Sequence, residues 1–266
     1  MIDETSGPQD EGGTDYGNDL SRDLGDGPPS SFRDTAPDLL APIDADAPIS
    51  GHVSAAADAP APSLAPEHDW DAARGLLMPL IRPTGTVGLR LADVSRSALA
   101  LNTSSHTLPL LGDGPCGLPV VYAIPAAGFD VVVNGEHLVS WGVEPAEIDA
   151  AAMANLAAWS AGAEWTPEES GDRRLISSDS GDGPDAARIL LPEVRAHLGA
   201  TLGAGGRIFV GLPDRHLLVA GITSGDDAEF EAQLAGFVAD HADGADEPID
   251  RRLFELVDGE LRPAAG

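Results

Sequence analysis

The residues best placed to do chemistry lie between positions 179 and 188, where acidic side chains precede an arginine. Asp179, Asp182 and Asp185 fall three residues apart, and Arg188 follows three residues later. A calcium-binding loop needs acids at alternate positions and a bidentate glutamate at the end of the loop, so this spacing does not predict a calcium site. The acids instead match residues that cap a helix and stabilise its first turn.

Arg188 allows two interpretations. With Asp185 three residues before it, the arginine would form an ordinary exposed ion pair on a helix, worth roughly a few tenths of a kcal/mol. A guanidinium beside a helix start would alternatively bind the carboxylate or phosphate of a ligand. Asp182, Asp185 and Arg188 are therefore the first candidate binding residues.

Asn155 is the next candidate, because it falls among apolar residues of a predicted helix. Ile148, Ala152, Asn155 and Trp159 share one stripe at helical spacing. A buried amide must find hydrogen-bond partners. We therefore expect Asn155 to hold a loop backbone near Trp141–Gly142, and a ligand contact is the alternative, with Trp141 as a further binding candidate.

The patterns for catalysis, metals and cofactors give little support to an enzyme. Ser140 lacks the G-x-S-x-G setting of a hydrolase nucleophile, and His137 would face the opposite side of a strand. His216 lies in a predicted exposed turn, and His241 near a helix end. With Cys116 as the only cysteine and no lysine, neither a thiolate zinc site nor a Walker-type loop is predicted. We expect no metal and no cofactor, and the patterns favour a non-enzymatic role.

The negative charge of the chain excludes some classes of binding partner. The net charge is −29, and every basic residue except histidine is an arginine. Such a chain repels phosphate backbones and acidic lipids, so we expect neither nucleic acid nor membrane as a partner. Another protein is the remaining candidate, and the sequence does not indicate an oligomeric state. A secretory signal and a bilayer-spanning run are not recognisable, which favours a cytoplasmic location.

The composition changes near position 68. Residues 1–68 hold 14 acids against two arginines and many prolines and glycines, which predicts an acidic, disordered tail. Residues 69–266 hold 30 acids against 13 arginines and carry the apolar patterns of one ordinary domain.

Hairpin and helix signals alternate along the domain. Asp69 is a predicted helix cap, and Asn134-Gly135 predicts a hairpin whose returning strand is 136–139. Helices are expected from Glu144, from Asp185 with Pro192 kinking or restarting it, and from 226 to Gly244 with Phe237 on its inner face. Further strands or hairpins are expected at 87–91, 107–111, 119–124, 129–133, 207–222 and 253–262.

This order predicts an α+β fold with a mainly antiparallel sheet and helices packed on one face. Residues 120–159 and 208–241 both read as a hairpin followed by a helix. These ββα-like units are either a duplication or two independent units.

Several segments, taken in order, resemble the YtpQ-like family of bacterial proteins, a domain of unknown function. The segments are Leu80-Ile81-Arg82-Pro83, Leu108-Pro109-Leu110-Leu111, the Trp141-Gly142 corner followed by Asn155-Leu156, and Asp182-Gly183-Pro184-Asp185-Ala186-Ala187-Arg188-Ile189-Leu190. The last run is similar to a family D-G-x-D-A-S-R-I-L pattern, and the resemblance covers about the last two thirds of the chain. The acidic tail departs from the family pattern.

Together these observations predict a non-catalytic protein-binding or regulatory module. The alternative is a small-molecule-binding protein or a hydrolase that uses the helix start at Asp182–Arg188.

Overall fold

The computed structural model of the chain describes residues 68–101, 106–126, 129–203, 205–222 and 227–264. The predicted tail, residues 1–68, therefore lies outside the described residues except for its last position. The described residues belong to one compact unit.

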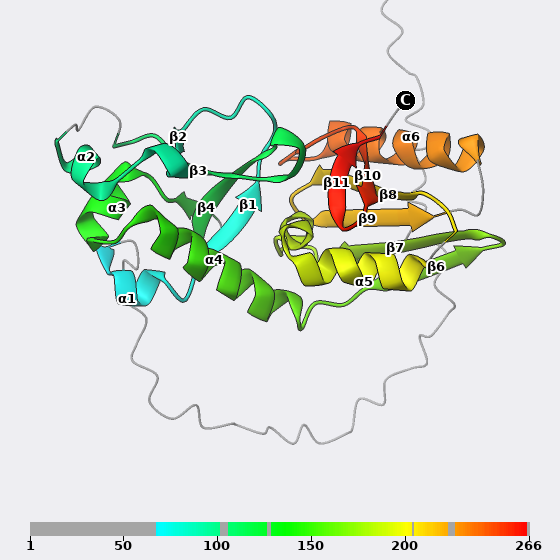
Figure 1. Ribbon diagram of the computed structural model, residues 1–266, viewed down its shortest axis with the longest axis horizontal. Helices are drawn as coiled ribbons and strands as arrows, with labels where there is room; N and C mark the ends of the chain where they lie inside the picture. Colours follow the sequence, from blue (N-terminus) through cyan, green and yellow to red (C-terminus); the bar gives the residue numbers. More distant parts are fainter. Residues whose placement is uncertain (1–67, 102–105, 127–128, 204, 223–226, 265–266) are drawn as a thin grey trace, which may run out of the picture. The chain divides into compact units, whose positions relative to one another are not determined.

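The described strands form two sheets, which are antiparallel except for one pair (Figure 1). The five-stranded sheet has the order β1-β4-β3-β2, and β5 also pairs with β4. The six-stranded sheet has the order β11-β10-β8-β9-β7-β6. The strands are β1 Met78–Ile81, β2 Leu89–Arg90, β3 Leu110–Asp113, β4 Pro119–Ala126, β5 Phe129–Val132, β6 Thr166–Ser170, β7 Arg173–Asp179, β8 Ile208–Asp214, β9 Leu217–Ile222, β10 Leu253–Val257 and β11 Glu260–Pro263.

Helices connect and cover these strands, so the predicted α+β class is confirmed. The α-helices are α1 Trp70–Ala73, α2 Arg96–Leu101, α3 Gly135–Trp141, α4 Pro145–Ser160, α5 Pro192–Leu202 and α6 Ala228–Gly244. Short 3-10 helices are η2 Leu91–Asp93, η4 Pro115–Gly117 and η5 Asp185–Leu190. Asp69 caps α1, as predicted, by accepting a hydrogen bond from the Asp71 amide.

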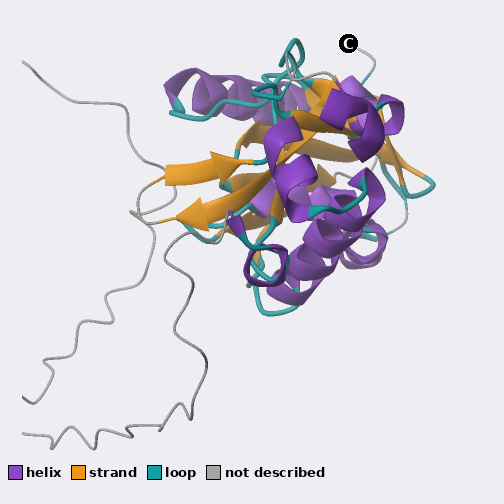
Figure 2. Cartoon of the chain, turned by 90° about the vertical axis from the view of Figure 1, so that its left-hand side faces the viewer, coloured by secondary structure: helices purple, strands orange, loops and turns teal. Residues whose placement is uncertain are grey.

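The six-stranded sheet carries helices on both faces, where the sequence led us to expect one. Helix α6 packs on β8 and β10, whereas α5 packs on β7 and β9 (Figure 1). Helices flank the strands on more than one side in the turned view as well (Figure 2). The physical reason is that every residue of β9 and nearly every residue of β8 is buried, so both faces need apolar cover.

Close approach of α6 depends on two glycines of the sheet. A Cβ at Gly211 would lie 2.4 Å from the Val238 side chain, and one at Gly221 would lie 2.8 Å from the ring of Phe230. The buried face of α6 consists of Phe230, Leu234, Val238 and Ala242. Phe237 is only half-buried and stacks on His241, so its predicted inward position is corrected.

The predicted hairpin at Asn134-Gly135 is wrong, because these residues begin helix α3. The Asn134 side chain accepts hydrogen bonds from the amides of Glu136 and His137, and the His137 ring accepts one from the Asn134 amide. Asparagine suits a helix N-cap as well as a tight turn. Gly135 is buried, and its Cβ would lie 3.3 Å from His106 and Leu99 atoms, so close packing explains the glycine.

The remaining elements follow the sequence more closely. Pro192 restarts the chain as α5, one of the two outcomes predicted for it, and the segment from Asp185 that precedes it is the 3-10 helix η5. The 207–222 hairpin forms, with Pro213 inside β8 and the turn at Arg215-His216. The two hairpin–helix units lie in different sheets.

Candidate functional site

The loop from the end of β7 to η5 brings the sequence-predicted acids to the edge of the core. Asp179 accepts a hydrogen bond from the Gly181 amide at 3.0 Å, which turns the chain. Gly183 then passes beneath the ring of Trp159 on α4, and a Cβ there would lie only 2.2 Å from that ring. Asp182 is exposed, whereas Asp185 is wholly buried.

Both carboxylate oxygens of Asp185 accept hydrogen bonds from its own loop and from β7. One carboxylate oxygen accepts a hydrogen bond from the Ser178 hydroxyl. The other accepts from the amide and the hydroxyl of Ser180, at 3.1 and 2.5 Å. The carboxylate therefore closes the loop that follows β7, which a helix cap alone does not explain.

Among the residues that the structure describes, Arg188 is the largest wholly buried side chain, with 1 % of its surface exposed. Its Nε donates to the Ser160 hydroxyl at 3.0 Å, and Nη2 donates to the carbonyls of Ser160 and Ala163 at 3.2 and 3.4 Å. Nη1 donates to the Ser178 hydroxyl and to the Glu164 carbonyl. The guanidinium also stacks over the ring of Trp165, 3.9 Å from its centroid.

The predicted exposed ion pair between Asp185 and Arg188 is therefore wrong. Both side chains are buried, and Ser178 joins them by donating to the carboxylate and accepting from the guanidinium. Burial lowers the pKa of Arg188, and the charge of Asp185 opposes that shift. All five N–H donors of the guanidinium have internal acceptors, so Arg188 has none left for a ligand.

Asn155 and Trp141 belong to another set of contacts, around α1. The Asn155 amide donates to the carbonyls of Arg74 and Leu77, at 2.8 and 2.9 Å. Asn155 holds a loop backbone, as predicted. The loop is the segment that follows α1, not the predicted Trp141–Gly142. Trp141 stacks on the rings of Trp70 and His137 instead.

The histidines and serines that might have formed a catalytic pair have structural contacts. Ser140 and His137 both lie on α3, and the Ser140 hydroxyl donates to the His137 carbonyl, not to the ring. His216 is half-buried, and its ring Nδ1 donates a hydrogen bond to the Gly183 carbonyl at 2.8 Å. The prediction that His216 is exposed is therefore wrong. His241 pairs with Asp214 at 3.0 Å.

A hollow of about 460 Å³ lies beside this network, at the end of α4. Its lining includes Trp159, Glu164, Asp179, Ser180 and Asp185. The sequence pattern placed Trp159 on an apolar stripe and gave no signal for Glu164, because only folding brings the end of α4 beside the loop after β7. The exposed carboxylates here are those of Glu164 and Asp179.

Within the described ranges, no group of three or more histidine, cysteine or acidic side chains converges as metal ligands. In the same ranges, no helix has both the length and the apolar character needed to cross a membrane.

Comparison with known proteins gave no match to a family model, to a curated protein or to a solved structure. The resemblance to the YtpQ-like family therefore stays a prediction.

Proposed function

We propose that this domain is a non-catalytic module that binds a basic segment of another protein at the hollow lined by Trp159, Glu164 and Asp179. The observation that carries the proposal is the hollow itself, in which an indole and two exposed carboxylates surround about 460 Å³ of space. An arginine or lysine side chain matches this lining, because a cation is attracted both to carboxylates and to an indole face. The expected cytoplasmic location is part of the same proposal.

The polar network beside the hollow favours recognition over catalysis. Asp185 lines the hollow, but both of its oxygens already accept hydrogen bonds. Arg188, which Ser178 links to Asp185, is buried with all of its donors used. A saturated polar network of this kind is rigid, and it presents a fixed surface to a partner.

The charge of the domain supports a basic partner. Residues 69–266 hold 30 acids against 13 arginines, and many of these arginines already pair with acids of the domain, among them Arg82, Arg173, Arg207 and Arg215. The field of the molecule therefore attracts cations and raises the rate of encounter with a basic partner.

The alternative, a small-molecule site or hydrolase centred on Arg188, requires a guanidinium with donors to spare. The saturated hydrogen bonding of Arg188 disfavours it. A small anion that binds at Arg188 would raise the melting midpoint of the wild-type domain by mass action, and we expect no such rise with acetate or phosphate.

The proposal is tested with a short glycine–arginine peptide and its glycine–glutamate counterpart, titrated calorimetrically into the wild-type protein. We expect the arginine peptide alone to bind, and added salt to weaken its binding. Asp179→Asn keeps the acceptor for the Gly181 amide and removes the charge, so it should weaken binding severalfold without unfolding the protein.

Asp240→Asn is the matched control, because Asp240 is exposed on α6 and does not line the hollow. It should leave the affinity for the arginine peptide nearly unchanged. Equal losses in Asp179→Asn and Asp240→Asn would show that only the net charge matters, and equal binding of both peptides would refute the proposal.

A further inference from the structure

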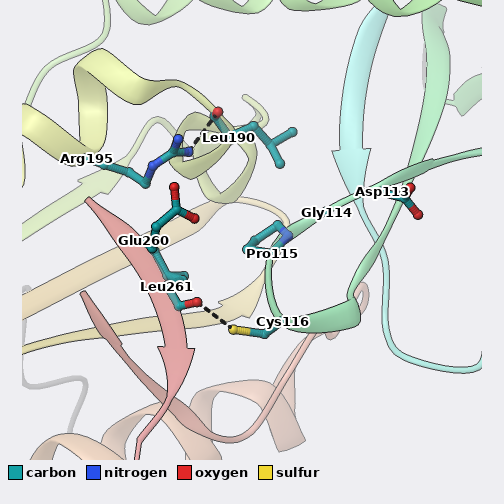
Figure 3. Close-up of a pocket in the computed structure, with 8 residues that line it drawn as sticks. All are labelled: Asp113, Gly114, Pro115, Cys116, Leu190, Arg195, Glu260 and Leu261. Carbon is teal, nitrogen blue, oxygen red and sulfur yellow. Dashed lines mark hydrogen bonds between the residues drawn. The ribbon is translucent and has the colours of Figure 1, made fainter. Parts of the chain in front are cut away.

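A second hollow, of about 350 Å³, lies between β11, η4 and the start of α5, away from the residues of the proposed function. Figure 3 shows Arg195 and Glu260 on one wall, with Pro115 and Cys116 on the other. Its lining therefore combines a guanidinium, a thiol and two carboxylates, of which Asp113 is already paired with Arg90.

Arg195 is held in place by backbone carbonyls. Its Nε donates to the Gly259 carbonyl at 2.7 Å, and Nη1 donates to the carbonyls of Ile189 and Leu190 at 2.8 and 2.9 Å. These bonds use three of the five donors of a guanidinium. Among the described residues, Nη2 has no hydrogen-bond acceptor and no carboxylate forms an ion pair with Arg195.

An arginine fixed in this way is ready to bind a carboxylate. Its side chain is already ordered by three hydrogen bonds, so a ligand would not have to immobilise it. The two remaining donors of Nη2 are enough for a charge-assisted hydrogen bond to one carboxylate oxygen.

Glu260 determines which carboxylate would fit. Its side chain is exposed on the same wall as Arg195 (Figure 3), so a simple anion at Arg195 would be repelled by a neighbouring negative charge. A molecule that also carries an ammonium group would pair with both side chains. The net charge of −29 adds to the disadvantage of a bare anion.

We propose that the hollow between Arg195 and Glu260 binds a small zwitterion of the amino acid class, with its carboxylate on Arg195 and its ammonium on Glu260. The volume of about 350 Å³ suits a small ligand. The apolar side chains of Pro115 and Leu190 line the same space and would contact the carbon skeleton.

Cys116 provides a built-in reporter, because it is the only cysteine of the chain and it lines this hollow. Its thiol donates to the Leu261 carbonyl at 3.3 Å, and burial raises its pKa. Alkylation by iodoacetamide at mildly alkaline pH, followed by mass spectrometry, therefore reports whether the hollow is open or occupied.

The experiment measures the alkylation rate of the full-length protein with glycine, L-alanine or γ-aminobutyrate, and with acetate or methylammonium as single-charge controls at equal ionic strength. Calorimetry on the same set gives the affinities directly. We expect at least one zwitterion to bind, and at ten times its Kd to slow alkylation about tenfold by mass action. Acetate and methylammonium should have little effect.

Two variants separate the roles of the charged groups. Glu260→Gln changes an exposed residue and should abolish the preference for a zwitterion over acetate. Arg195→Gln removes the cation and should lose protection by every zwitterion, while the melting midpoint confirms that it is folded. The absence of both calorimetric heat and protection by any zwitterion would overturn the proposal, as would equal protection by acetate in the wild-type protein.

Discussion

Arg188 illustrates how one residue can join elements that are far apart in the sequence. Its guanidinium holds the end of α4 through Ser160 and the end of β7 through Ser178, and it stacks on Trp165 between them. Charged groups are costly to bury unless they are paired and hydrogen-bonded. Here Asp185 supplies the balancing charge through Ser178, so these five residues act as one unit.

The first prediction follows from that unit. Arg188→Ala leaves Asp185 buried without its balancing charge, so it should reduce the free energy of unfolding by about 3–5 kcal/mol. Arg74→Ala is the control, because Arg74 forms an exposed ion pair with Asp71, and its loss should cost about 0.5 kcal/mol or less. Urea unfolding of both variants measures the difference. Similar costs at the two positions would contradict the structural role given to Arg188.

The sequence predicted which of these residues matter but not how they interact. Asp185 and Arg188 stood out by their spacing, and local charge rules then suggested an exposed pair. The partners that decide their role lie on other elements, with Ser160 separated from Arg188 by 28 positions. An ordinary serine carries no signal in a single sequence, so neither Ser160 nor Ser178 was found.

At the scale of elements, the helical spacing of apolar residues located α6 but not its exact rotation. The buried face of α6 consists of Phe230, Leu234, Val238 and Ala242, because an amphipathic helix must cover a sheet, whereas the predicted inner residue Phe237 is only half-buried. Local signals that suit two structures were less reliable. Asn134-Gly135 fits both a hairpin turn and a helix start, and the tertiary packing of Gly135 against Leu99 favours the helix.

A second prediction compares two phenylalanines of α6. Phe230 is 4 % exposed and packs against Gly221, whereas Phe237 is half-buried beside His241. Phe230→Ala should cost about 3–5 kcal/mol of unfolding free energy. Phe237→Ala removes less buried area and should cost about 1–2 kcal/mol. Urea unfolding monitored by circular dichroism provides both values, and the reverse order would mean that the rotation of α6 is wrongly assigned.

At the scale of the whole domain, the two sheets share one hydrophobic core and are also joined by a cluster of charges. The core includes Tyr122 and Ile124 of β4 together with Val210 and Leu218 of the other sheet. The charged cluster also draws on both sheets. Arg82 and Asp130 come from the part of the chain that forms the five-stranded sheet, and Arg215 and Glu247 come from the part that forms the six-stranded sheet. These four side chains are partly buried, so salt screens them less than it screens surface pairs.

The last prediction concerns the response of this cluster to acid. Desolvation raises the pKa of Glu247, but hydrogen bonds and charges from Arg82 and Arg215 outweigh it and leave the pKa lowered. A carboxylate with a lowered pKa in the folded state stabilises the fold above its unfolded pKa of about 4.3, and that contribution is lost as the pH falls further. Glu247→Gln should therefore reduce stability at pH 7 and make it depend less on pH between about 5 and 3. Urea unfolding across this range, with Asp240→Asn as the charge-matched control, measures the effect. Identical pH profiles for the two variants would mean that the cluster does not couple the sheets.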